Sequence, residues 1–305
     1  FANLLEKMAI LVIPDKESEM EEMEEEKINP DLARLDERFL DKPGFAMEEC
    51  RSVAINMARK SQKAMNLAIN LLGEYSDKTA DRVEKLENQI DQYEDALGTY
   101  LVKLSGREIS IKDSRVLSVL LHCIGDFERI SDHAVNIRDA AVEMHKKDLE
   151  FSEKAKQELN VFSNAIRDIV DRAVMAFETG DMELAKEVEP LEQVVDALNK
   201  EEKQRHINRL RTGACTIELG FILSDISTNF ERAADHCSNI AVCLLQIDEG
   251  GFDTHEYLDI LKEENSEEFR HEYMELSERY ALPESKHTGK TAKTEKMEES
   301  KDTGK

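Results

Sequence analysis

Two segments of this sequence share a pattern of residues that could do chemistry. Residues 128–137, Glu-Arg-Ile-Ser-Asp-His-Ala-Val-Asn-Ile, return as residues 231–240, Glu-Arg-Ala-Ala-Asp-His-Cys-Ser-Asn-Ile, with six identities at an offset of 103. Upstream, residues 87–91 (Glu-Asn-Gln-Ile-Asp) correspond to residues 192–196 (Glu-Gln-Val-Val-Asp) at an offset of 105. Each half of the chain therefore carries two Glu-x-x-x-Asp pairs.

Carboxylates spaced in this way could bind a metal ion. Residues four apart lie on one face of a helix, where two like charges cost roughly a few tenths of a kcal/mol in an isolated helix. A hard cation with oxygen ligands, such as Mg, Mn, Ca or oxidised iron, would compensate for this repulsion. If the two helices of each half lie side by side, four carboxylates converge on one site. The eight candidate metal ligands are Glu87, Asp91, Glu128, Asp132, Glu192, Asp196, Glu231 and Asp235.

The alternative interpretation of these pairs is a network of ion pairs and helix caps. Because 66 of the 305 residues are acidic, a single Glu-x-x-x-Asp pair carries no weight as a motif. Recurrence of the pairs at matched positions in both halves favours metal binding. Asn136 and Asn239, four residues after the motif aspartates, could add amide oxygens to the site.

The other polar residues of the repeat have simpler interpretations. His133 and His236 directly follow the motif aspartates, about 100° further round the helix, which favours packing or support of the ligands over metal ligation. Arg129 and Arg232 could clamp a phosphate, but ion pairs with neighbouring acids are favoured.

Motifs of common enzyme classes are absent from the sequence. It has no G-x-x-x-x-G-K-[ST], no G-x-S-x-G and no H-E-x-x-H. Di-iron carboxylate bundles use Glu-x-x-His, whereas His133 lies five residues after Glu128. We therefore expect a protein that is not an enzyme.

The composition is typical of long helices, with 12 Gly, 5 Pro and no Trp. Apolar residues recur at three- and four-residue steps, and the loops between these segments are short. The pattern predicts an all-α fold of two tandem three-helix bundles, with antiparallel neighbouring helices. Asp77 or Thr79, and Asp113 or Ser114, are the expected caps of the second and third helices. The six helices are expected over residues 47–75, 77–105, 113–147, 152–179, 181–211 and 214–248.

We divide the chain into four parts. Residues 1–46 contain an apolar opening and a flexible acidic linker, 47–148 and 149–250 are the two repeats, and 251–305 hold a polar helix at 257–280 and a disordered tail. The net charge of −25 disfavours nucleic acid as a partner. Five cysteines without a C-x-x-C pair suit buried thiols in a reducing compartment. The longest apolar stretch, 8–13, is far shorter than the roughly 20 residues of a membrane-spanning helix.

The repeated three-helix unit resembles PhoU, a family of phosphate-uptake regulators. The resemblance covers residues 47–248 and rests on Glu-x-x-x-Asp in each second helix and Glu-Arg-[Ile/Ala]-x-Asp-His-x-x-Asn-Ile in each third helix. It implies a six-helix PhoU-like fold and metal binding by the eight carboxylates named above. The ion would be divalent or trivalent, with Mg, Mn, Fe and Zn left open. The sequence departs from the PhoU pattern in two places. Ala233 replaces the Ile of the third-helix motif, and Pro190 lies inside the fifth helix, where we expect a kink.

A second resemblance concerns residues 32–51, LARLDERFLDKPGFAMEECR, which are similar to the junction before the PhoU-like domain of bacterial sodium/phosphate cotransporters. It implies a cytosolic regulatory domain of such a symporter, at the inner face of the plasma membrane. Its partner would be the membrane domain, in cis or in trans. The alternative is a free-standing PhoU-type adaptor of a phosphate ABC transporter and a sensor kinase. Phosphate-sensing partners and a homo-oligomer are left open.

Overall fold

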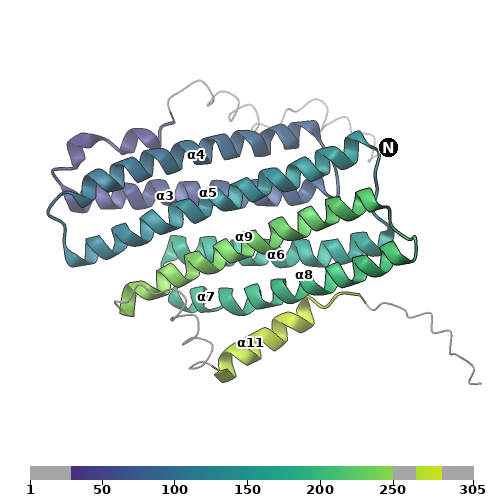
Figure 1. Ribbon diagram of the computed structural model, residues 1–305. Helices are drawn as coiled ribbons and strands as arrows, with labels where there is room; N and C mark the ends of the chain where they lie inside the picture. The colour runs from purple at the N-terminus through teal and green to yellow at the C-terminus, as the bar shows by residue number, and fades with distance from the viewer. Residues whose placement is uncertain (1–28, 250–265, 284–305) are drawn as a thin grey trace, which may run out of the picture.

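Helices make up the regular structure of residues 29–249 and 266–283, which are the residues that the computed structural model describes (Figure 1). No strand occurs in these two ranges, so the predicted all-α class is confirmed. The elements are η1 (Leu32–Arg34), η2 (Glu37–Phe39), α3 (Pro43–Leu71), α4 (Asp77–Ser105), α5 (Ile111–Lys146), α6 (Glu153–Thr179), α7 (Met182–Lys186), α8 (Val188–Arg211), α9 (Ile217–Glu249) and α11 (Ser266–Arg279).

The long helices form the two predicted three-helix bundles. Helices α3, α4 and α5 pack against one another, and α6, α8 and α9 form the second set. The bundles lie side by side, because α5 packs along α9 and α3 along α6 (Figure 1). Helices α4 and α8 are therefore the outer helices, and α11 covers α8. This arrangement places each pair of motif-bearing helices, α4 with α5 and α8 with α9, in contact.

The predicted caps of the second and third helices were wrong. Ser76 caps α4 and Ser110 caps α5, each accepting a hydrogen bond from a backbone amide three residues later. Asp77 and Asp113 lie instead in the first turn of their helices, where a negative charge interacts favourably with the helix dipole. Helix α6 keeps to its expected range of 152–179, because Ser152 caps its start and Gly180, with a left-handed φ of 70°, ends it.

The predicted fifth helix is interrupted at Glu187, between α7 and α8. Pro190 is the reason, since its ring clashes with the carbonyl of the residue four positions earlier, Lys186, which is the last residue of α7. In the first turn of α8, proline is tolerated because the amide it lacks has no helical partner there. The expected kink is thus a break between two helices.

The chain before the first bundle is folded from residue 29 onward. Helix α3 begins at Pro43, four residues earlier than expected, and Leu40 is buried against the bundle. The hydroxyl of Tyr93 donates to Asp31 Oδ2 at 2.5 Å, and the hydroxyl of Tyr100 donates to the Asp36 carbonyl at 3.0 Å. The acidic run of the predicted linker and the tail after residue 283 lie outside the described residues.

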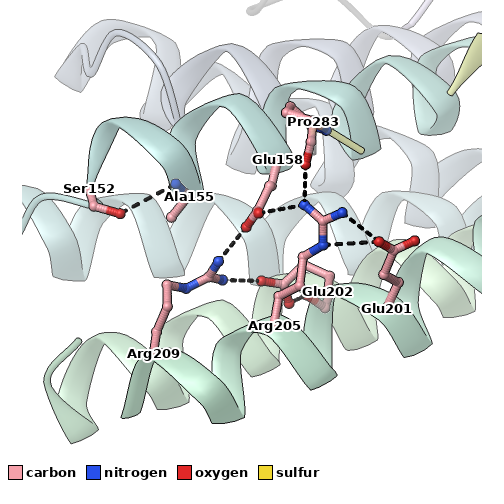
Figure 2. Close-up of polar contacts among 9 residues, drawn as sticks. Ser152, Ala155, Glu158, Glu201, Glu202, Arg205, Arg209 and Pro283 are labelled. Carbon is pink, nitrogen blue, oxygen red and sulfur yellow. Dashed lines mark hydrogen bonds and ion pairs between the residues drawn. The ribbon is translucent and has the colours of Figure 1, made fainter. Parts of the chain in front are cut away.

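The C-terminal helix α11 is the described part of the polar helix predicted at 257–280. It buries Leu276, and the hydroxyl of the following Tyr280 donates to Asp168 Oδ2 at 2.8 Å. The carbonyl of Pro283 accepts a hydrogen bond of 2.6 Å from Arg205 of α8 (Figure 2). In residues 29–249 and 266–283, no helix has the length and apolar character needed to cross a membrane.

Candidate metal centre

Three of the predicted metal ligands of the first half come together. Glu87 and Asp91 of α4 and Asp132 of α5 each offer a carboxylate oxygen, and these oxygens lie within 4.8 Å of one another. The cluster forms because a four-residue step places both α4 carboxylates on the face that packs against α5. Three anionic oxygens at this separation could hold a hard cation such as Mg²⁺ or Mn²⁺.

Glu128, the fourth predicted ligand of this half, lies outside that group. Its carboxylate is 3.4 Å from Arg129 Nε, while Arg129 Nη1 is 3.5 Å from Asp132 Oδ2. The ion pairs favoured for Arg129 from the sequence are therefore present. Arg129 shares its charge between one clustered carboxylate and one outside the cluster.

Three acidic groups of this half, Glu87, Asp91 and Glu128, have raised pKa values. Burial raises the pKa of Glu87 and of Asp91, and in both cases neighbouring carboxylates add to the shift. Burial, followed by the charge of Asp132, raises the pKa of Glu128 to about 6. The site is thus short of positive charge, which a bound cation would supply.

The metal-free protein should lose stability as the pH rises through this range. Glutamate in the unfolded chain has a pKa near 4.5, so between pH 4.5 and 6 Glu128 is more protonated in the folded than in the unfolded protein. The free energy of unfolding therefore falls as the pH rises through this range. We expect a loss of about 1 kcal/mol from this group, after discounting for its partial exposure. Urea unfolding of chelator-treated parent and Glu128→Gln proteins at pH 4.5 and 7 measures it. Parallel pH dependence in the two proteins would contradict this prediction.

The second half carries its four carboxylates on equivalent helices but gives them different neighbours. Lys200 Nζ lies 3.1 Å from Asp196 Oδ2, and Lys203 Nζ lies 3.7 Å from Glu231 Oε2. The side chain of Asn199 donates to the same Glu231 oxygen at 2.6 Å. Two ammonium groups of α8 thus lie beside carboxylates of the second half.

Sequence comparison of the halves explains this difference. At the offset of 105, Lys200 and Lys203 correspond to Asp95 and Gly98 of the first half. Of the residues that the structure describes, Glu87, Asp91 and Asp132 are the one set with three ligand atoms so close together. Burial, followed by the charge of Glu231, raises the pKa of Asp235. Metal binding by the second half stays a prediction for its four carboxylates, Glu192, Asp196, Glu231 and Asp235.

The histidines of the repeated motif lie where the two bundles meet. The rings of His133 and His236 stack with centroids 5.5 Å apart. His133 Nδ1 is 2.9 Å from Asn229 Oδ1, and His236 Nδ1 is 2.8 Å from Asp126 Oδ1. This arrangement agrees with the packing role favoured from the sequence.

The motif asparagines join the same contacts. Asn136 Nδ2 donates to Asn229 Oδ1 at 3.0 Å, and Asn239 Nδ2 donates to Asp126 Oδ1 at 3.4 Å. The side-chain amides of Asn136 and Asn239 thus connect α5 with α9. The sequence did not reveal this contact. Asp126 and Asn229 are themselves 103 residues apart, so each repeat receives the His and Asn side chains of the other.

The family model of the PhoU domain matches residues 54–141 and 159–244. The chain is 25% identical over 219 residues to a PhoU homologue of Pseudomonas aeruginosa, covering 72% of this chain and 90% of that protein. A homologue from Aquifex aeolicus is 25% identical over 213 residues, covering 70% of this chain and 95% of that protein. Both are named phosphate-specific transport system accessory proteins.

Solved structures show the same fold. The crystal structure of PhoU from Pseudomonas aeruginosa has a TM-score of 0.63 at 23% identity, covering 67% of this chain and 97% of that chain. The crystal structure of PhoU from Streptococcus pneumoniae has a TM-score of 0.62 at 17% identity, covering 69% of this chain and 99% of that chain. The family match takes in both repeats and more than half of the sequence, and so this chain belongs to the PhoU domain family.

Proposed function

We propose that this protein is a PhoU-type regulator of phosphate transport, which acts by contact with transport components at the cytoplasmic face of the membrane. The observation that carries the proposal is the family match over both three-helix repeats. The names of the relatives, accessory proteins of a phosphate-specific transport system, support it. The role is regulatory and requires no turnover by the protein itself.

Two forms of this function were expected from the sequence. The relatives named above favour the adaptor of a phosphate ABC transporter over the regulatory domain of a sodium-dependent cotransporter. Affinity purification of the tagged natural protein from membranes distinguishes the two forms. Recovery of ABC transporter subunits or a sensor kinase supports the adaptor, whereas a covalently attached or co-purifying sodium cotransporter supports the other form.

Deletion of the gene tests the function itself. We expect phosphate uptake to lose its normal response to external phosphate, and restoration of the gene to restore that response. Uptake that responds identically with and without the gene would overturn the proposal. Measurement of radiolabelled phosphate uptake at low and high external phosphate is sufficient.

We propose further that Glu87, Asp91 and Asp132 bind one hard metal ion. The support is the proximity of their three carboxylate oxygens and the lack of a comparable cluster elsewhere in the described residues. All-carboxylate ligands favour Mg²⁺ or Mn²⁺ over Zn²⁺, which prefers nitrogen and sulfur. The ion would fix α4 against α5 and neutralise their facing charges.

Asp132→Asn is expected to weaken Mn²⁺ binding by at least about 10–100-fold, because it removes the one ligand that α5 gives to the cluster. Isothermal titration calorimetry of the chelator-treated protein measures the affinity. Asp139→Asn is the matched control, since Asp139 lies on the same helix with its side chain 61% exposed. Equal affinities in the parent and Asp132→Asn would reject this site. A stoichiometry of two ions would indicate that the second half also binds metal.

A further inference from the structure

Two buried cysteines face each other across the contact between the bundles. Cys123 lies on α5 and Cys243 on α9, both are free thiols, and the two side chains are hydrogen-bonded to each other. Cys123 is fully buried, and Cys243 is 9% exposed. The pair belongs neither to the carboxylate cluster nor to the histidine contacts.

The register of the two helices independently places these thiols opposite each other. Hydrogen bonds connect His133 with Asn229 and Asn239 with Asp126, so α5 and α9 run antiparallel along their contact. Cys123 is three residues before Asp126 on α5, and Cys243 is four residues after Asn239 on α9. Both steps are close to one helical turn and lead in the same direction along the contact.

The internal repeat shows that packing does not require sulfur at this position. The offset of 103 relates Cys123 to Ile226 and Cys243 to Ala140, at the other end of the same contact. Both counterparts are buried apolar residues. An apolar pair therefore fills the equivalent space, and the dithiol is a departure confined to one end.

Cys243 is the thiol within reach of small molecules. It lines a cavity of about 690 Å³, together with His122, Asp126 and Gln246, whereas Cys123 does not line this cavity. The hydrogen bond from Cys123 lowers the pKa of Cys243, and the same contact raises the pKa of Cys123. Since the thiolate is the reactive form, Cys243 is suited to react first, with Cys123 behind it.

We propose that Cys123 and Cys243 form a reversible disulfide when the protein meets hydrogen peroxide. The Cys243 thiolate attacks one peroxide oxygen, the O–O bond breaks, and a sulfenic acid and hydroxide result. Cys123 gives its proton to the hydroxide, and its sulfur attacks Cys243 Sγ. The S–S bond forms, and the sulfenic oxygen leaves as hydroxide, which becomes water by taking up a proton. In total, two thiols and one peroxide give one disulfide and two waters.

This cross-link would join the helices that carry the third-helix motif of each repeat. It would hold α5 against α9 at one end and restrict any movement of the bundles relative to each other. A small dithiol would reverse it by thiol–disulfide exchange, becoming a disulfide itself. The proposal does not depend on a bound metal or on the transport partner.

The test treats the purified protein with hydrogen peroxide, blocks the remaining thiols by alkylation and analyses the peptides by mass spectrometry. We expect free thiols to fall from five to three per chain. A linked pair of peptides containing Cys123 and Cys243 should appear and disappear with dithiothreitol. Folded protein that lacks this linked pair after peroxide treatment would overturn the proposal.

Variants separate the two roles. Cys123→Ala should stop the reaction at the Cys243 sulfenic acid, which dimedone traps, and Cys243→Ala should give neither the adduct nor the cross-link. Dimedone labelling of Cys123 instead would contradict the assigned order.

Two control variants identify the linked sulfur. Because one tryptic peptide holds both Cys237 and Cys243, Cys237→Ser shows which of them is linked, and this variant should retain the cross-link. Cys215→Ser is a second control, at the most accessible thiol, and loss of the cross-link there would also reject the proposed pair.

Discussion

Glu158→Ala is expected to lower the free energy of unfolding by about 3–5 kcal/mol, because it removes the central anion of a buried charge network. Glu158 of α6 is fully buried and binds Arg205 at 2.8 Å and Arg209 (Figure 2). Arg209 also lies 2.8 Å from the buried Glu202. Without Glu158, Arg209 keeps the buried Glu202, but Arg205 keeps only the exposed Glu201 and the Pro283 carbonyl.

Urea unfolding followed by circular dichroism measures this loss. Glu153→Ala is the matched control, since this carboxylate belongs to the same helix but its side chain is 86% exposed. We expect the control to change stability by no more than about 0.5 kcal/mol. A Glu158→Ala protein as stable as this control would show that the network contributes little net stabilisation.

Phe230→Ala should be similarly damaging, at about 3–5 kcal/mol, through loss of buried apolar surface and the cavity left behind. Phe230 of α9 is fully buried and packs edge-to-face on Phe162 of α6, with centroids 5.2 Å apart. The residue directly precedes Glu231 of the second Glu-x-x-x-Asp pair. Its packing therefore helps to orient that part of α9.

Phe221→Ala provides the comparison for this core substitution. Phe221 lies on the same helix and is 69% exposed, so its removal leaves no cavity in the core. The difference between the two urea midpoints isolates the contribution of burial from that of helix propensity. Equal midpoints for Phe230→Ala and Phe221→Ala would contradict the importance of this aromatic contact.

The internal repeat and the helices were predictable because their signals are local. Apolar periodicity and short loops identified the helical segments, and the four-residue spacing placed the motif carboxylates on one helix face. Pro190 marked the disturbance in the fifth helix. The choice between nearby caps, such as Ser76 and Asp77, depends on backbone angles that composition alone does not distinguish.

The difference between the two carboxylate clusters was visible in the sequence but could not be interpreted there. Lys200 and Lys203 stand where the first half has Asp95 and Gly98, yet a lysine on a helix can equally point into solvent. Lys200 meets Asp196 within α8, at the four-residue spacing, whereas only the packing of α8 on α9 brings Lys203 to Glu231. The same limit applies to Glu158, which nothing in the sequence separates from 65 other acidic residues.

The sequence by itself determined the helices, their repetition and the faces on which the motif residues lie. The tertiary structure alone decided which faces meet, and thereby gave His133 a partner in Asn229 and Cys123 a partner in Cys243. The physical reason is that helix formation depends on residues within a few positions of each other. Burial, buried ion pairing and thiol proximity depend on contacts between segments far apart in the sequence, 47 residues for Glu158 and Arg205 and 96 for His133 and Asn229. These contacts form only when α5 packs against α9 and α6 against α8.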